Sequence, residues 1–209
     1  MAASTTIWFG LDKGTKWHDW VRIVNISNNR AKVLALVRDS QGRTVWSGER
    51  ELNPYQPWVI PAEQSGADRR GDMSLQVRSD APIVGERHLH HGKDSMAFPG
   101  ASVEGGTVGR RLFFPELYSG GYDWLRIINV GEATALVSVI ARDLNGRIIR
   151  QLSGRIRPLG FWIVSDKNLG QVNGTLEIQS TQPILGERQL DYTAAGKGSV
   201  GQLGQVIER

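Results

Sequence analysis

A Glu-Arg pair occurs twice in this 209-residue chain, as Glu86-Arg87 and again as Glu187-Arg188. Both pairs lie in strand-like sequence, where neighbouring side chains point to opposite faces, so the two charges of one pair cannot neutralise each other. An inward-facing arginine needs a partner, and the candidates are backbone carbonyls or the aspartates Asp19 and Asp123. We expect a structural role for these pairs; a role in binding a partner is the alternative.

Residues suited to acid-base or nucleophilic catalysis are sparse. A pair of catalytic carboxylates needs a second repeated acid near the Glu-Arg pairs, and Asp12 with Glu116 is the only candidate. The sequence has no Gly-x-Ser-x-Gly elbow, no phosphate-binding Gly-x-x-x-x-Gly-Lys-Ser/Thr loop and no cysteine. Thiol nucleophiles, disulfides and cysteine-containing zinc sites are therefore excluded. We expect a protein that is not an enzyme and uses no cofactor.

His88 and His90 could begin a metal site, because residues two apart on a strand project from the same face. Two imidazoles at this spacing suit zinc or nickel, but a third ligand must come from elsewhere, and His18 is the only histidine outside segment 88–91. The matching positions later in the chain are Gln189 and Asp191, so the histidines do not belong to a repeated framework. Solvated histidines at a strand end are the alternative.

Two tryptophans recur at matching positions, Trp20 with Trp124 and Trp58 with Trp162. A duplicated core needs the same large apolar side chains twice, so we expect all four to fill cores. The alternative is that they form exposed aromatic platforms for sugar rings, which would make carbohydrate a possible ligand.

These recurrences belong to a duplication of the chain. Residues 19–58 match residues 123–162 without a gap, with 13 of 40 positions identical. A second block, residues 73–91, matches residues 174–192, with 8 of 19 positions identical. Two blocks in the same order, about 100 residues apart, indicate a duplicated domain, because this period is too long for a solenoid repeat.

The blocks predict the domain boundaries. We expect one module at residues 5–91, a Gly-rich linker at 92–108, a second module at 109–192 and a Gly-rich tail at 193–209. Within the tail, residues 205–209 could form a short strand. Such a strand could pair with a sheet edge of its own chain or of a neighbour, which would support self-association.

Each module reads as β-structure. The run 136–141 is short and rich in apolar and β-branched residues, as a strand is. The Asn145-Gly146 pair that follows predicts a hairpin with a type I′ turn, and Gln41-Gly42 is its counterpart in the first module. Residues 74–78 and 175–179 alternate between polar and apolar, as half-buried strands do. No segment has sustained helical periodicity. We therefore predict an all-β chain made of two tandem antiparallel β-sandwich domains.

The second module opens on Phe113-Phe114-Pro115-Glu116, continues through Trp124-Leu-Arg-Ile-Ile-Asn129, and closes on Ser180-Thr-Gln-Pro-Ile-Leu-Gly-Glu-Arg188 and Tyr192. This pattern resembles tandem β-sandwich repeats of bacterial surface and exported proteins, and it is also similar to the sensory rhodopsin transducer family. The resemblance implies a cell-envelope or extracellular building block, or a small sandwich that binds a ligand or partner. It implies no catalytic residue.

Composition sets limits on partners and location. The chain carries 25 basic and 21 acidic residues, a net charge of +4, and these charges are interspersed, so we expect no nucleic-acid partner. No apolar run is long enough for a membrane span, and the start of the sequence lacks the pattern of a secretory signal. The lack of cysteine suits a cytoplasmic protein as well as an exported one.

From the sequence we thus expect a non-enzymatic structural or adhesion-type module of a bacterial cell surface or extracellular assembly, which associates with copies of itself. The alternative is a carbohydrate-binding or signalling adaptor protein.

Overall fold

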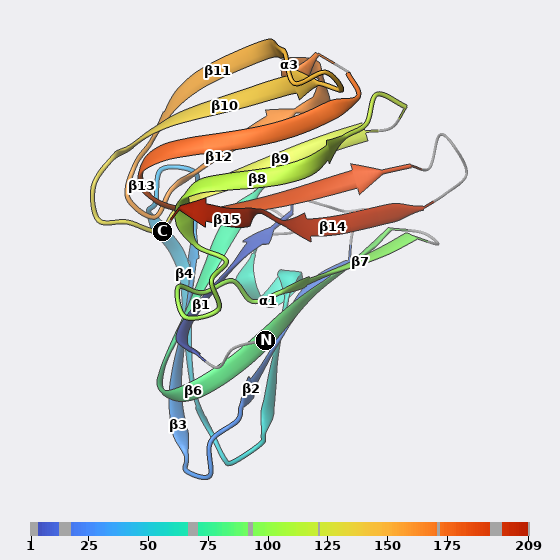
Figure 1. Ribbon diagram of the computed structural model, residues 1–209. Helices are drawn as coiled ribbons and strands as arrows, with labels where there is room; N and C mark the ends of the chain where they lie inside the picture. The colour runs from blue at the N-terminus through green and yellow to red at the C-terminus, as the bar shows by residue number, and fades with distance from the viewer. Residues whose placement is uncertain are drawn as a thin grey trace. The chain divides into compact units, whose positions relative to one another are not determined.

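The computed structural model describes residues 4–12, 18–66, 71–91, 94–120, 122–170, 172–192 and 198–208. They form two compact units, Met1–Gly105 (unit 1) and Gly106–Arg209 (unit 2), each built almost wholly of antiparallel strands (Figure 1). The predicted fold class, all-β with two tandem antiparallel β-sandwich domains, is confirmed.

Unit 1 contains strands and one helical turn in the order β1 (Ser4–Leu11), β2 (His18–Asn25), β3 (Ala31–Arg38), β4 (Thr44–Leu52), β5 (Pro57–Pro61), α1 (Ala62–Ser65), β6 (Met73–His91) and β7 (Asp94–Pro99). Unit 2 follows the same plan with β8 (Gly109–Leu117), β9 (Tyr122–Asn129), β10 (Ala135–Asp143), β11 (Ile148–Ile156), β12 (Phe161–Ser165), α3 (Asp166–Leu169), β13 (Gly174–Asp191), β14 (Ser199–Leu203) and β15 (Gln205–Glu208).

Strand β6 belongs to both layers of unit 1. Its first part, up to Ser79, lies between β3 and β1, whereas the part from Ile83 onward lies between β2 and β7. The first layer therefore has the order β4-β3-β6-β1 and the second layer the order β5-β2-β6-β7. In Figure 1, β6 is the long strand that curves from one layer into the other.

Unit 2 repeats this arrangement around β13. Its first layer has the order β11-β10-β13-β8-β15, and its second layer the order β12-β9-β13-β14. Only Gly204 separates β14 from β15, so one extended segment joins the two layers on this side. On the opposite side, β11 and β12 each have a single strand neighbour within the described part of the chain.

Glycines allow the close packing where the long strands change layers. The N–H of Gly100 donates to the carbonyl oxygen of Gly85 at 2.8 Å. A Cβ on Gly85 would lie 2.7 Å from Ile7 Cδ1 and 2.8 Å from Phe9 Cζ, closer than real carbon atoms approach. Unit 2 repeats the hydrogen bond with its own glycine pair, Gly204 to Gly186 at 2.9 Å.

Each unit has its own apolar core. In β2 the buried positions alternate with more exposed ones, so that Val21 and Ile23 face inward with no exposed surface. They join Phe9, Leu75 and the rest of the unit 1 cluster. The equivalent cluster of unit 2 includes Phe114, Leu125 and Leu176. Two separate cores explain why the sequence repeat spans a whole domain.

The predicted type I′ turn at Asn145-Gly146 is wrong, although a hairpin is present. Gly146 has φ of +79°, but Asn145 does not have a positive φ, and the Gly146 N–H donates to the Asp143 carbonyl at 3.0 Å. This is a type I turn followed by a glycine bulge. The Asp143 side chain selects it, because its Oδ1 accepts the N–H groups of Asn145 and Arg147, both at 2.9 Å.

The predicted linker at 92–108 is wrong in its middle part. Residues Asp94–Pro99 form β7, which pairs with the second half of β6, and Ala101 then bridges Trp8 of β1. These residues satisfy an edge of β6 that would otherwise be exposed, so glycine content alone misled the prediction. Gly92 and Lys93 lie outside the described residues.

The predicted tail forms part of the unit 2 sandwich. Residues 199–208 supply β14 and β15, and β15 pairs with β8 of its own unit, from Gln205 opposite Phe113 to Glu208 opposite Arg111. The expected short strand is therefore confirmed, and its partner is an edge of its own chain. Residues 193–197 and 209 lie outside the described part of the structure.

Candidate functional site

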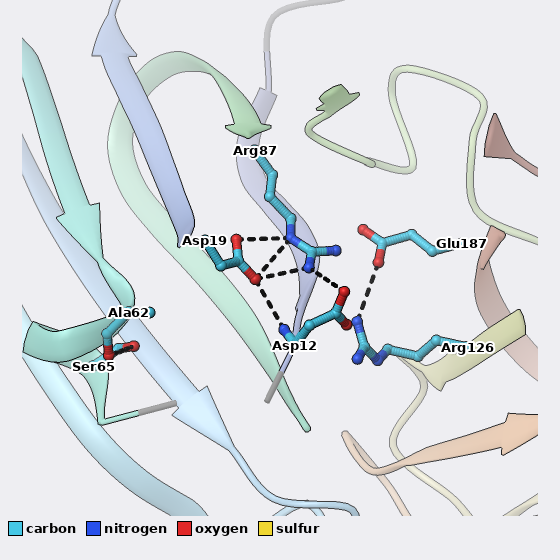
Figure 2. Close-up of polar contacts among 7 residues, drawn as sticks. All are labelled: Asp12, Asp19, Ala62, Ser65, Arg87, Arg126 and Glu187. Atoms are coloured by element: carbon cyan, nitrogen blue, oxygen red, sulfur yellow. Dashed lines mark hydrogen bonds and ion pairs between the residues drawn. The ribbon is translucent and has the colours of Figure 1, made fainter. Parts of the chain in front are cut away.

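Arg87 of β6 is completely buried in unit 1 and lies between two aspartates (Figure 2). Its Nε lies 3.0 Å from Oδ1 of Asp19, and its Nη2 lies 2.7 Å from Asp19 Oδ2 and 2.9 Å from Asp12 Oδ2. The N–H of Asp12 donates to Asp19 Oδ2 at 2.9 Å, which ties β1 to β2. The expected contact of Arg87 with Asp19 is thus present, and Asp12 joins it.

Arg188 repeats the aspartate contact in unit 2, with a glutamine in place of the second aspartate. Its Nε and Nη2 donate to Oδ1 and Oδ2 of Asp123 at 2.8 and 2.6 Å, a two-pronged contact that fixes the orientation of both groups. A third bond, 3.3 Å long, joins Nη1 to Oε1 of Gln202 on β14. Each arginine therefore links the long central strand to neighbouring strands of its own unit.

Asp12 and Glu116 differ in their roles. Asp12 contacts the buried arginine of unit 1, whereas Glu116 accepts a hydrogen bond from the hydroxyl of Tyr192. Burial, followed by the hydrogen bond to Glu116 and the charge of Glu116, raises the pKa of Tyr192 to about 12. The ring of Tyr118 lies 4.9 Å from that of Tyr192. Among the described contacts, neither acid meets the glutamate of its own unit's Glu-Arg pair.

The pKa of Asp19 reflects its burial. Burial raises this pKa, the Arg87 charge and hydrogen bonds oppose the rise, and the charge of Asp12 adds to it. Both aspartates contact the same guanidinium, which stabilises their charged forms. A buried, hydrogen-bonded ion pair of this kind fixes the geometry of strands, and breaking it by removing one partner is costly.

The glutamates of the Glu-Arg pairs face the opposite way, as strand alternation requires. Glu86 contacts Nε2 of His88 on the outer face of the second layer. Glu187 lies 3.5 Å from Nη1 of Arg126, its partner on β9, and both side chains are buried. The two units thus share the inward arginine but use the outward glutamate differently.

His88 and His90 share a face as expected, but their rings stack. The centroids lie 6.3 Å apart with an angle of 9° between the planes, and Trp20 stacks on His88 at 4.0 Å. Ring nitrogens of stacked imidazoles point along parallel planes and do not converge on one ion. Among the described residues, no group of three or more potential ligands could hold a metal. The side chain of His91 lies outside the described part.

The prediction that the tryptophans fill cores is confirmed for Trp58, holds only in part for Trp162, and is wrong for Trp20 and Trp124. Trp58 belongs to the core of unit 1, and Trp162 is half-buried against the core of unit 2. Trp20 and Trp124 lie on outer faces, because inward positions of β2 and β9 fall on the residues either side of them. Guanidinium groups lie over both rings, 5.3 Å from the Trp20 centroid and 4.9 Å from that of Trp124.

A polar cluster on the outer face of the first layer was not anticipated. In unit 2, Glu177 is only 3 % exposed and lies between two arginines. Arg111 Nε is 2.7 Å from Oε1, and Arg142 Nη2 is 3.1 Å from Oε2. Gln179 Nε2 donates to Oε1 at 2.8 Å. Burial alone would raise the pKa of Glu177, but hydrogen bonds from Gln179, Arg142 and Arg111 outweigh it, so the pKa lies below 4.5.

The sequence contained a signal for this cluster. In the aligned blocks Glu177 replaces Gln76, a change of charge at the centre of an otherwise matching strand. In unit 1 the corresponding arginines are Arg38, which is 6 % exposed, and Arg78, which is exposed.

Open grooves lie on the outer faces of both first layers. One of about 590 Å³ in unit 2 is lined by Ser138, Ser153, Gln179 and their neighbours on β10, β11 and β13. Another of about 450 Å³ lies on β3 and β4 of unit 1, where Lys32, Glu49 and Arg50 contribute. The two grooves occupy equivalent places but differ in charge, so the units do not present the same surface.

No family model and no curated protein matches the chain. Among solved structures, Thermotoga maritima 1070 is similar with a TM-score of 0.42 and 19% identity, over 50% of this chain and 98% of that one. The Anabaena sensory rhodopsin transducer is similar with a TM-score of 0.31 and 14% identity, over 39% and 93%. A β-glucuronidase of Bacteroides uniformis has a TM-score of 0.23 and 10% identity, over 94% and 25%.

Within the described residues, no helix combines the length and the apolar character that crossing a bilayer requires.

Proposed function

We propose that this chain is a non-enzymatic structural or adhesion-type module made of two β-sandwiches, which associates with further copies of itself. One observation carries the proposal: the buried arginine-aspartate contact recurs in both units, Arg87 with Asp19 and Arg188 with Asp123. Because the same contact lies between strands in both units and pairs each carboxylate with a guanidinium, we assign it a structural role. The setting at a bacterial cell surface or in an extracellular assembly rests on the motif resemblance alone.

Edge strand β11 supports association with a second copy. Among the described strands its one neighbour is β10, and it carries Ile148 and Ile149, which are 53% and 39% exposed. An edge strand offers unpaired backbone groups to another chain, and Ile148 and Ile149 add exposed apolar surface where β11 begins. The equivalent edge of unit 1, β4, instead exposes the charged residues Glu49, Arg50 and Glu51, which discourage pairing.

The carbohydrate alternative has less support. This alternative requires exposed aromatic platforms, but His88 stacks on the ring of Trp20 and Arg22 lies over it. An aromatic ring whose faces contact protein side chains has little surface left for a sugar.

Light scattering and electron microscopy over a range of concentrations test the proposal. We expect the mass to rise with concentration, and we expect Ile148→Lys to suppress that rise because it places a charge on the β11 edge. Thr44→Lys is the matched control at the equivalent edge position of unit 1, and it should leave the mass unchanged. A wild-type chain that stays monomeric at all concentrations would refute self-association.

A further inference from the structure

The outer faces of the two first layers carry residues at equivalent positions, but unit 1 lacks one negative charge that unit 2 has. Gln76 of β6 lies opposite Leu36 of β3, and Glu177 of β13 lies opposite Ile140 of β10, so the two residues occupy equivalent positions. On the other side, Gln76 lies opposite Trp8 and Glu177 opposite Phe113. Unit 1 therefore has a neutral amide where unit 2 has a carboxylate.

Each unit has two arginines around this position. Arg38 and Arg142 occupy the same place, opposite Ser74 and Thr175. The second arginine of unit 1, Arg78, lies on the central strand opposite Thr6 of β1. In unit 2 the second arginine lies on the first strand instead, where Arg111 is opposite Gln179. Both units thus bring two guanidinium groups to the same patch, but only unit 2 supplies an acid.

The two arginines of unit 1 have no carboxylate partner among the described residues. No ion pair and no side-chain hydrogen bond joins Arg38 or Arg78 to any of them, whereas both arginines of unit 2 contact Glu177. Burial and then the charge of Arg78 lower the pKa of Arg38, so the two like charges are close enough to interact. Two nearby cations in a partly desolvated patch attract an anion.

Two further groups at the patch have unused hydrogen-bonding capacity. The indole Nε1 of Trp8 is a buried donor without an acceptor, and Oε1 of Gln76 is buried without a donor. Because Oε1 makes no bond, the amide of Gln76 can turn to present its nitrogen without losing one. Gln179 already donates its amide nitrogen to the carboxylate in unit 2.

We propose that unit 1 binds a small carboxylate ligand between Arg38 and Arg78, against the amide of Gln76, so that the ligand supplies the negative charge that Glu177 supplies in unit 2. Each guanidinium donates to one carboxylate oxygen, as Arg111 and Arg142 do, and Trp8 Nε1 supplies a neutral donor. Arg78 is exposed, so the ligand approaches from its side. This inference is independent of the proposed self-association.

Acetate is the probe, with chloride at matched ionic strength as the reference. We expect acetate to raise the thermal unfolding midpoint of the wild-type chain more than chloride does, because a ligand that binds only the folded state stabilises it. Titration by NMR should shift the indole N–H resonance of Trp8, which Trp8→Phe identifies. Arg78→Gln, a change at an exposed position, should weaken acetate binding roughly tenfold or more, since a charged hydrogen bond is lost.

The two units provide opposite matched variants. Gln76→Glu supplies the missing acid, so it should raise the midpoint without ligand and abolish the response to acetate. Glu177→Gln removes the acid from unit 2, so it should lower the midpoint and add a second acetate response. The proposal is overturned if acetate acts no more strongly than chloride on the wild type, or if Arg78→Gln and Gln76→Glu both respond as the wild type does.

Discussion

Replacing Arg188 by methionine tests whether the buried ion pairs hold the sandwiches together. The change removes the two bonds to Asp123 and the bond to Gln202, and it leaves the Asp123 carboxylate, whose side chain is 4% exposed, without its guanidinium. Removing one partner of a buried pair costs about 3–5 kcal/mol. A domain of this size has a free energy of unfolding of roughly 5–15 kcal/mol, so unit 2 should lose a large fraction of its stability.

Guanidinium chloride unfolding, followed by tryptophan fluorescence, measures this cost. With a slope of roughly 4 kcal/mol per molar, the midpoint of the unit 2 transition should fall by about 1 M. Arg87→Met should act in the same way on unit 1, which assigns the two transitions. Arg155→Met is the control, because Arg155 is exposed on β11, and it should change the free energy of unfolding by less than about 0.5 kcal/mol.

A second substitution separates the lost attraction from the buried charge that remains. The double variant Arg188→Met, Asp123→Leu removes both charges, and it should recover at least about 2 kcal/mol relative to Arg188→Met alone. If Arg188→Met costs less than about 1 kcal/mol, or if the double variant is no more stable than the single one, the architectural interpretation of the ion pair is refuted.

Three further predictions follow from the site geometry. Trp58→Ala should lower the free energy of unfolding by about 3–5 kcal/mol, whereas Trp20→Ala should cost less than about 1.5 kcal/mol, and equal costs in denaturant titrations would contradict the assigned faces. The pKa of Tyr192 is raised to about 12, so stability should decline from about pH 10 upward as the unfolded state releases its proton first. Absorbance titration should show one late-ionising tyrosine that Tyr192→Phe eliminates, together with this part of the alkaline decline. The pKa of Glu177 is lowered from 4.5, so the stability that its charged form contributes is present at neutral pH and is lost as the pH falls through the lowered value. The variant Glu177→Gln should therefore lose less stability in acid than the wild type does. An unchanged acid profile of the free energy of unfolding would argue against the cluster.

The duplication made the fold predictable from sequence. Two aligned blocks with strand-like alternation imply two separate cores, and in the structure β2 follows such an alternation, with Val21 and Ile23 on the inward face. The same alternation places Trp20 on the outer face, but the recurrence of a large apolar residue outweighed it in the prediction. Period-two geometry is the stronger constraint, since shifting the register by one residue moves every side chain to the other face.

The candidate sites were less accessible to sequence reasoning. The Glu-Arg repeat identified Arg87 and Arg188, and Asp19 and Asp123 were the expected partners because they recur in the same blocks. Strand β7 escaped notice because pairing across a layer depends on distant backbone groups, not on local composition. The cluster around Glu177 needs the register of three strands, which places Arg111 and Arg142 on either side of it.

The long strands β6 and β13 have a consequence for how each unit unfolds. Since one continuous strand contributes hydrogen bonds to both layers, neither layer can melt while the other stays intact. Amide hydrogens at the centre of β6 and β13 should therefore exchange only through opening of the whole unit. Those of β4 and β11, each of which pairs with a single strand in the described part of the chain, should exchange through local fraying. Each sandwich should therefore unfold as one cooperative unit, because its long central strand belongs to both layers.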